Sequence, residues 1–185
     1  MPCHLFSIGH SNQPLDRFIA LLVQHGIKVL ADIRRFPGSR KFPQFNQENL
    51  IEVLPEAGIE YCWLEILGGR RGKATNESSK NLGLRNASFR NYADYMLTEK
   101  FREGIEQLLT AASKGPTAFM CSESVFWRCH RRLVSDFLLV NGITVQHIMP
   151  SGDLRPHTLT EEARVKAGEL TYPPAGGEQK ELSFD

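Results

Sequence analysis

The 185-residue sequence lacks the features that mark several specialised classes of protein. No apolar run approaches the roughly 20 residues that a membrane-spanning helix needs. The N-terminus has no charged segment followed by an apolar one, as a secretory signal peptide would. Neither charge dominates, because 22 Lys and Arg oppose 21 Asp and Glu. These absences predict a cytoplasmic protein without a membrane partner and argue against broad electrostatic attraction to nucleic acid.

The net charge of +1 hides an uneven distribution of charge. From Ser151 onward the chain has 4 basic and 7 acidic residues, so residues 1–150 carry a net charge of +4. The sequence therefore predicts a mildly basic body with an acidic C-terminal segment. Such a body can bind an anion locally through its arginines.

Cysteine is scarce, and the common cysteine motifs are missing. The chain has Cys3, Cys62, Cys121 and Cys129, which in a reducing compartment are more often buried, metal-bound or catalytic than cross-linked. There is no Cys-x-x-Cys pair and no His-Glu-x-x-His helix, and six residues separate Cys121 from Arg128 where a phosphatase loop has five. We predict no cofactor. Zinc or iron remains an alternative, with ligands drawn from Cys121, Cys129, His130, Glu123, His10 and His147.

Apolar strand-like and amphipathic helix-like segments alternate along the chain. We expect strands at 4–8, 28–33, 59–63, 117–120 and 143–148, and helices at 14–25, 46–56, within 89–112, and at 129–140. This alternation predicts a single three-layer α/β domain with a mainly parallel sheet of about five strands and helices on both faces.

Three segments lie outside this alternation of strands and helices. Residues 67–85 form a long polar excursion of the kind that covers a site, and 160–166 is a weak helix. The domain is expected to span residues 1–169, and 170–185 to form a flexible tail, because the Pro-Pro-Ala-Gly-Gly stretch and the polar end offer little to bury.

Side chains of catalytic type follow three of the expected strands. They are His10 and Ser11 after the first strand, Asp32 and Arg34 after the second, and Cys121 and Glu123 after the fourth. In an open parallel sheet the ligand crevice lies beyond the carboxyl ends of the strands. The sequence therefore predicts that these residues share one site.

The densest segment of such side chains runs from Cys121 to Arg132 and reads Cys-Ser-Glu-Ser-Val-Phe-Trp-Arg-Cys-His-Arg-Arg. Cys129 lies at an expected helix start, where free backbone N–H groups and the helix dipole lower the pKa of a thiol. Arg131 can bind a phosphate or carboxylate through two parallel hydrogen bonds. This segment predicts a reactive thiolate and an anionic ligand.

Several of these residues also have a purely structural interpretation. Both Cys121 and Cys129 fit buried packing residues, and Glu123 could pair with Arg128 or Arg131. His130 fits a surface residue equally well. The sequence leaves these alternatives open.

Three further positions are open in the same way. His147, on an apolar strand, fits a satisfied core histidine better than a ligand. Trp127 fits a buried aromatic better than a platform for a base. Gly68-Gly69 before Arg70 fits either a backbone nest for phosphate or a simple turn.

Several ordered segments resemble one known family. They are Ser7-Ile8-Gly9-His10-Ser11, Asp32 to Ser39, Phe42 to Phe45, Tyr61 to Arg70, Phe89 to Met96, Cys121-x-Glu123, Cys129-His130-Arg131 and His147-Ile148. Over about residues 4–153 the chain is similar to the prokaryotic family numbered 488 among the domains of unknown function. The resemblance implies no activity. Its Cys-x-Glu, Cys-His-Arg, Gly-His-Ser and Asp-x-Arg elements fall on the residues selected above, although Ser124 to Arg128 replace an Asp-Pro-like linker.

The leading hypothesis is a small cytosolic enzyme, a cysteine-dependent hydrolase or transferase, acting on an anionic substrate such as a nucleotide or a nucleic-acid component. Cys121 or Cys129 would be the nucleophile and Glu123 or His10 the proton carrier. The remaining candidates would hold the anion or orient its ligands: Asp32, Arg34, Ser11, Arg70, His130 and Arg131. The competing hypotheses are a non-catalytic nucleotide or nucleic-acid binding module and a protein with a Cys/His metal site.

Overall fold

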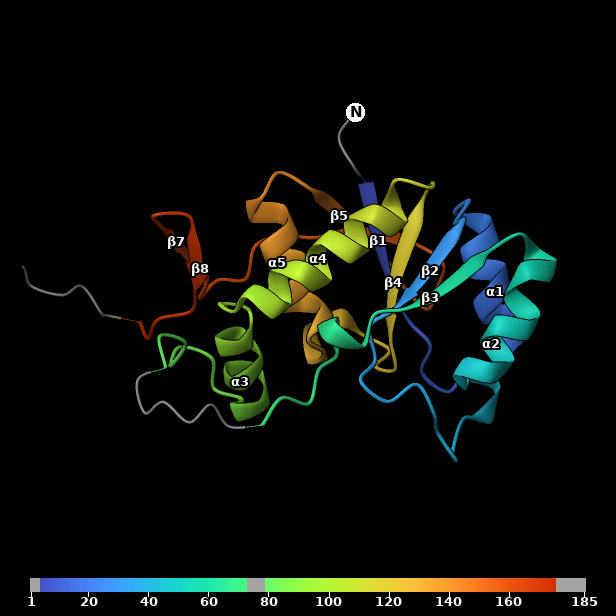
Figure 1. Cartoon of the computed structure of the whole chain (residues 1–185), viewed down its shortest axis with the longest axis horizontal. Coiled ribbons are helices and arrows are strands. Elements are labelled where there is room, and N and C mark those ends of the chain that lie inside the picture. The colour runs from blue at the N-terminus through green and yellow to red at the C-terminus, as the bar shows by residue number, and fades with distance from the viewer. Residues whose placement is uncertain (1–3, 73–78, 176–185) are drawn as a thin grey trace, which may run out of the picture.

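The computed structural model describes residues 4–72 and 79–175, which form a mainly parallel sheet between two layers of helices (Figure 1). The strands are β1 (His4–Gly9), β2 (Val29–Asp32), β3 (Glu60–Trp63), β4 (Thr117–Cys121), β5 (Thr144–Ile148), β6 (Leu154–Pro156), β7 (Arg164–Lys166) and β8 (Glu169–Thr171). The α-helices are α1 (Leu15–Gln24), α2 (Gln47–Val53), α3 (Ala87–Tyr95), α4 (Glu99–Ala112) and α5 (Arg131–Val140). Short 3-10 turns are η1 (Pro43–Phe45), η2 (Leu54–Ala57), η3 (Glu65–Leu67) and η4 (Phe126–Arg128). No described helix is long and apolar enough to cross a membrane.

The strand order places the three strands of the predicted site side by side. The sheet runs β3-β2-β4-β1-β5-β6, and β4 pairs in parallel with both β1 and β2. The carboxyl ends of β1, β4 and β2 therefore meet at one edge. The predicted α/β class with a largely parallel sheet is confirmed.

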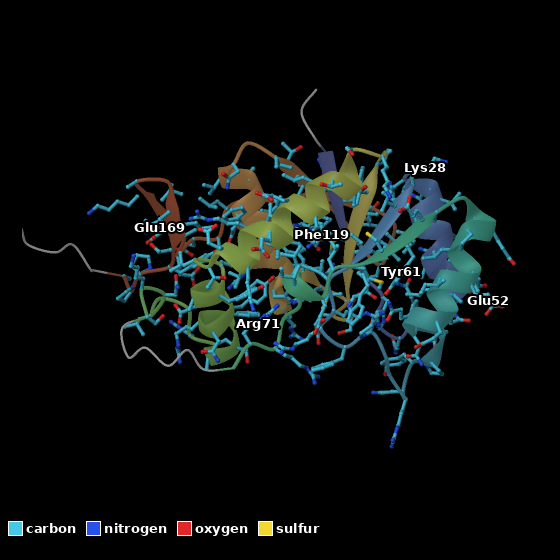
Figure 2. The ribbon with its side chains drawn as sticks, in the orientation of Figure 1. Lys28, Glu52, Tyr61, Arg71, Phe119 and Glu169 are labelled. Atoms are coloured by element: carbon cyan, nitrogen blue, oxygen red, sulfur yellow. The ribbon has the colours of Figure 1, made fainter. Side chains whose placement is uncertain are left out.

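The two faces of the sheet have separate cores. Ala118 and Met120 of β4 pack with α1 and α2 on one face, whereas Phe119, between them, packs with α4 and α5 on the other. Phe119 lies at the centre of the molecule (Figure 2). This alternation of buried side chains is the two-residue period of a strand that is covered on both sides.

The secondary structure at the end of the chain differs from the prediction in two respects. The sheet has six strands, because the short exposed strand β6 adds to β5 in antiparallel orientation. The helix expected at 160–166 is absent, since β7 pairs with β8 through a turn at Ala167 and Gly168, both with positive φ.

We predicted that a flexible tail begins at residue 170. The structure differs, because that part of the chain is anchored in the core. Leu170 and Tyr172 are buried, and the Tyr172 hydroxyl donates a hydrogen bond to Asp136 of α5 at 2.8 Å. Residues 176–185 of the predicted tail lie outside the described residues. The folded unit therefore extends past the predicted boundary of 169.

Candidate active site

Two cysteines and a histidine meet at the carboxyl edge of the sheet. Cys121 ends β4, Cys129 follows η4, and His130 directly precedes α5. Their side-chain donor atoms all lie within 4.8 Å of one another. The His130 Nδ1 is 3.5 Å from the Cys129 sulfur and 3.8 Å from the Cys121 sulfur. We call these three residues the cysteine cluster, and all three are buried, so the interpretation of His130 as a surface residue was wrong.

The ring of His130 is held in one orientation. Its Nε2 donates a hydrogen bond to the carbonyl of Ile33 at 3.1 Å, so in the neutral ring Nδ1 carries the lone pair that faces the two sulfurs. The ring of Tyr92 packs against it at 5.0 Å. A Cβ added at Gly69 would lie 2.9 Å from Nδ1. The role of Gly69 is thus to let the chain approach His130 closely.

The segment that carries Gly69 is tied to α3 through its carbonyls. The Tyr92 hydroxyl donates to the carbonyl of Leu67, and the Tyr95 hydroxyl to that of Ile66, each at 2.6 Å. Arg71 lies beside α3 (Figure 2), donates to the carbonyl of Ile66 at 2.7 Å and stacks on Tyr95 at 3.8 Å. The start of the predicted excursion therefore covers the cysteine cluster, whereas residues 73–78 of that excursion lie outside the described residues.

The two thiols have opposite pKa shifts. For Cys129, burial works against the charged form, but a hydrogen bond with Cys121 and then the charge and backbone N–H of Arg131 lower the pKa to about 6. For Cys121, the hydrogen bond with Cys129, followed by burial, raises the pKa to about 12. At neutral pH the pair therefore holds one proton, on Cys121, and Cys129 is a thiolate.

Arg131 is a buried cation without a carboxylate partner in the described part of the chain. Only 1% of its surface is exposed. Its Nη2 donates to the carbonyl of Glu123 at 2.6 Å, its Nη1 to the hydroxyl of Ser7 at 3.4 Å, and its Nε has no partner there. Because a buried charge is costly unless it is compensated, the Cys129 thiolate is the natural counter-charge to this guanidinium.

The Glu123 side chain is not part of this arrangement. It is exposed and forms no ion pair within residues 4–72 and 79–175, so the expected pairing of Glu123 with Arg128 or Arg131 is replaced by the contact of its backbone carbonyl with Arg131. Arg70 is likewise exposed, with φ of 45°, and its carbonyl accepts a hydrogen bond from Arg35. The structure therefore does not bring the side chains of Glu123 and Arg70 into the cysteine cluster.

Asp32, Arg34 and His10 form a second group at the same edge. Asp32 accepts hydrogen bonds from the Nε and Nη2 of Arg34 at 2.9 and 2.5 Å, and Arg34 contacts the Nε2 of His10 at 3.2 Å. Burial lowers the pKa of His10 to about 4, so its ring is neutral at pH 7. Asp32 therefore holds the Arg34 guanidinium in place. Arg34 is already neutralised by this ion pair, which leaves Arg131 as the cation available to the cysteine cluster.

Ser11 lies beside this group through its backbone. Its N–H donates to the carbonyl of Ser122 at 2.9 Å, and its carbonyl accepts a hydrogen bond from the Nδ1 of His10 at 2.8 Å. The Ser11 hydroxyl contacts only the side chain of Asn12 in the described residues. Ser11 thus joins the ends of β1 and β4, and no hydrogen bond links its hydroxyl to the cysteine cluster in the described residues.

A buried chain of hydrogen bonds leads away from Arg131, and sequence reasoning did not find it. It runs through Ser7, His147, His157 and Asp136, with distances of 3.4, 2.6, 2.9 and 2.9 Å. The interpretation of His147 as a satisfied core histidine is confirmed. Asp136, a charged residue on the buried face of a helix, was the signal in the sequence, but its partners His157, Thr160 and Tyr172 follow later in the chain. The rest of the hydrogen-bond chain depends on β1 and β5, which pair Ser7 directly with His147.

We expect the stability of the protein to fall as the pH drops below about 6.5, the ordinary pKa of histidine. Burial, with a smaller effect of the His157 charge, lowers the pKa of His147 to about 2. Between these two values the unfolded state binds a proton that the folded state does not, so each pH unit of acidification removes up to about 1.4 kcal/mol per such histidine.

Urea denaturation of the wild type and of His147→Gln between pH 7 and pH 4 measures this effect. The variant should be less stable at pH 7, because it disturbs the hydrogen bonds to Ser7 and His157, and its stability should depend less on pH. Parallel pH profiles for the two proteins would rule out the assigned role of His147.

The fold and the site define this molecule as a mainly parallel α/β protein with two cysteines and a histidine at the carboxyl edge of its sheet. The chain belongs to the family described as domain of unknown function DUF488, whose model matches residues 14–138. This match confirms the resemblance read from the motifs, and it includes the whole cysteine cluster but not His10 or His147. Searches of curated proteins and of solved structures found no significant match.

Proposed function

We propose that this protein is a cysteine-dependent enzyme, a hydrolase or transferase, that acts on an anionic substrate of the nucleotide or nucleic-acid component class. The observation that supports the proposal is the setting of the Cys129 sulfur. It accepts the backbone N–H of Arg131 at 3.5 Å, next to a buried guanidinium without a carboxylate partner in the described residues. A sulfur in such surroundings is a nucleophile near neutral pH.

The proposed reaction uses three side chains. Cys129 reacts as the thiolate that it already is near neutral pH. The thiolate forms a bond to an electrophilic carbon or phosphorus of the substrate, and the leaving group departs with the bonding electron pair and takes a proton from solvent. His130 Nδ1, 3.5 Å from the Cys129 sulfur, then takes the proton of the water or second acceptor that removes the group from sulfur. The charge of Arg131 stabilises the negative charge that develops.

The contacts of His10 and Glu123 make them poorer proton carriers than His130. His10 Nδ1 donates to the Ser11 carbonyl and its Nε2 contacts Arg34, so both ring nitrogens are engaged. The exposed fractions of the two cysteine residues, 8% for Cys121 and 3% for Cys129, favour a small reacting group such as a phosphoryl or acyl group.

Ultraviolet titration of the thiolate tests the state of Cys129 directly. We expect a transition near pH 6 that Cys129→Ser abolishes and that Cys121→Ser moves to higher pH, because the thiol of Cys121 stabilises the thiolate. Cys62→Ser is the matched control, since burial raises the pKa of Cys62 to about 11. A Cys129 transition near the ordinary thiol value of about 8.5 would refute the proposed nucleophile.

Turnover of small nucleotides then distinguishes an enzyme from a binding module. Cys129→Ser should abolish turnover and leave ligand affinity unchanged, whereas His130→Gln should reduce turnover by about 10²- to 10⁴-fold. A protein that binds such ligands, and in which neither replacement changes any measured property, is a binding module.

A second candidate function, a metal centre, is favoured by the distances within the cysteine cluster. Tetrahedral zinc with bonds of about 2.3 Å to sulfur and 2.0 Å to nitrogen separates those two ligand atoms by about 3.5 Å, and the observed separations are 3.5 and 3.8 Å. Iron has similar ligand preferences. The hydrogen bond from His130 to the Ile33 carbonyl is the usual support for a metal-binding histidine.

Metal analysis of the purified protein decides between the two candidates. One equivalent of zinc or iron that is retained by Cys62→Ser and lost from Cys121→Ser, Cys129→Ser and His130→Ala establishes the metal centre and overturns the free thiolate. Metal-free protein with the transition near pH 6 establishes the thiolate.

A further inference from the structure

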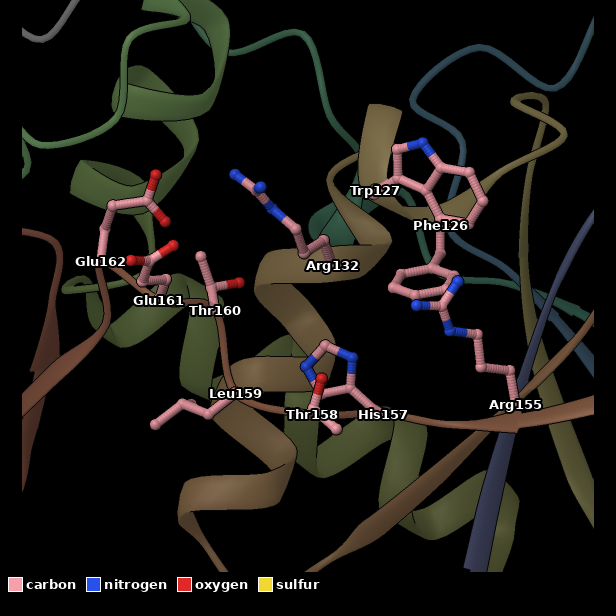
Figure 3. A pocket seen from close by; sticks show the side chains of 10 residues that line it. All are labelled: Phe126, Trp127, Arg132, Arg155, His157, Thr158, Leu159, Thr160, Glu161 and Glu162. Atoms are coloured by element: carbon pink, nitrogen blue, oxygen red, sulfur yellow. The ribbon is translucent and has the colours of Figure 1, made fainter.

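A cavity of about 500 Å³ lies beside the turn that carries Cys129 (Figure 3). Its walls come from η4, the first turn of α5, β6 and the segment 157–162. Trp127 precedes Cys129 by two residues and Arg132 follows it by three, and neither belongs to the cysteine cluster. A cavity of this size accommodates a small organic ligand.

One end of the cavity is an aromatic platform. Trp127 is 41% exposed, so the expectation of a buried aromatic was wrong. The Arg155 guanidinium lies 5.5 Å from the centre of the Trp127 ring and 5.7 Å from that of Phe126. Figure 3 shows these three side chains together at one end. A fixed indole with an exposed face is a platform on which a planar ring stacks.

The middle of the cavity has unpartnered polar atoms. The Nε of Arg132 and the hydroxyl of Thr160 are buried, and neither has a hydrogen-bond partner in the described residues. Both residues line the cavity, and the Arg132 guanidinium is stacked over Phe89 at 5.1 Å. These two atoms lie beneath the wall of the cavity, and an oxyanion in the cavity would bind the guanidinium end of Arg132, which Figure 3 shows between the two ends.

The other end of the cavity is acidic. In the view of Figure 3, Glu161 and Glu162 lie opposite Trp127, with Arg132 and Thr160 between. The two glutamates balance the charges of Arg132 and Arg155, so a polyanion gains little here. The charges favour a ligand with a single oxyanion over a polyphosphate or a nucleic-acid strand.

His157 connects this cavity to the cysteine cluster. Its Nδ1 contacts His147 and its Nε2 contacts Asp136, both at 2.9 Å, so both ring nitrogens are engaged and its ring forms a wall of the cavity. The same chain of hydrogen bonds continues through Ser7 to Arg131. The cavity and the cysteine cluster are thus parts of one buried polar framework.

We propose that the cavity beside η4 binds a nucleoside monophosphate, with the base stacked on Trp127 and the phosphate bound by Arg132 and Thr160. The inference rests on the proposed function only in the ligand class, which it narrows from nucleotides in general to monophosphates. Binding itself does not require Cys129, and this independence allows the two proposals to be tested separately.

Calorimetric titration tests the site with adenosine monophosphate, cytidine monophosphate, adenosine and inorganic phosphate as probes. The monophosphates should bind at least tenfold more tightly than adenosine or phosphate alone. Trp127→Ala and Arg132→Met should each weaken the binding of the monophosphates by about tenfold or more. The first removes the ring on which the base stacks, and the second removes the guanidinium that binds the phosphate. Arg128→Met, an exposed arginine one residue before Cys129, is the matched control and should bind like the wild type.

Three results would overturn the inference. One is an absence of monophosphate binding, and another is wild-type affinity in Trp127→Ala and Arg132→Met variants whose thermal melting shows that they are folded. Phosphate binding as tight as that of the monophosphates would remove the role of the base. If Cys129→Ser binds the monophosphates as the wild type does but no turnover is found in the wild type, the cavity stands and the proposed enzyme fails. If turnover depends on Cys129 but the Trp127→Ala and Arg132→Met replacements do not change monophosphate binding, the proposed enzyme stands and the cavity proposal fails.

Discussion

Replacing Gly9 with alanine is expected to destabilise the protein by more than about 3 kcal/mol, at the upper end of what overpacking costs. A Cβ at Gly9 would lie 1.7 Å from the carbonyl oxygen of Glu123 and 2.8 Å from the Nη2 of Arg131. That carbonyl accepts the 2.6 Å hydrogen bond from Arg131. The added methyl group therefore forces apart the end of β1 and the segment after β4, and it breaks a buried hydrogen bond of a charged group.

Urea denaturation of Gly9→Ala beside Gly38→Ala measures this effect. A Cβ at Gly38 meets no atom within 4 Å, so this control should differ from the wild type by no more than about 0.5 kcal/mol. If Gly9→Ala unfolds at the same urea concentration as Gly38→Ala, the close approach of β1 to Glu123 is not a feature of the folded protein.

Replacing Asp32 with asparagine is expected to remove about 3–5 kcal/mol of stability, the usual effect of leaving one half of a buried ion pair without its partner. The Asp32 carboxylate is fully buried and accepts hydrogen bonds from Arg34 and, at 2.7 Å, from the Tyr61 hydroxyl. An asparagine side chain has one acceptor oxygen and no charge. The Arg34 guanidinium, only 6% exposed, would remain buried without a counter-charge.

A double replacement separates the ion pair from simple loss of packing. Asp32→Asn combined with Arg34→Met should recover a large part of the lost stability, because no uncompensated charge remains. Glu60→Gln is the control, since it disrupts an exposed ion pair with Lys114 and should cost less than about 1 kcal/mol. Additive losses in the double variant would show that Arg34 does not depend on the Asp32 charge.

The sequence predicted the elements of the domain well where their local pattern was strong. The helical segment expected within residues 89–112 resolves into two helices, and α4 buries Phe101, Ile105 and Leu108 at the expected helical spacing. The pattern failed where elements were short. Strand β6 has three exposed residues and no alternation to detect, and β7 and β8 are held by pairing with each other.

The candidate site was predicted in part. Strand ends pointed to Cys121, Asp32 and His10, because a parallel sheet brings carboxyl ends to one edge. They could not show that the Glu123 carboxylate turns to solvent while its carbonyl binds Arg131. That difference depends on Gly9, which allows the two segments to approach, and a helical or strand period carries no information about such an approach.

The sequence by itself determined the alternation of strands and helices, the family and the placing of two cysteines after a strand and before a helix. Only the tertiary structure decided that β4 lies between β1 and β2, that His130 faces both sulfurs, and that Arg131 is buried without a carboxylate partner in the described residues. The physical reason is the range of the interactions. Periodicity shows only which face of an element is buried. In contrast, His130 contacts Ile33, and Arg131 and His147 both contact Ser7, far away in the chain, so these contacts depend on strand order.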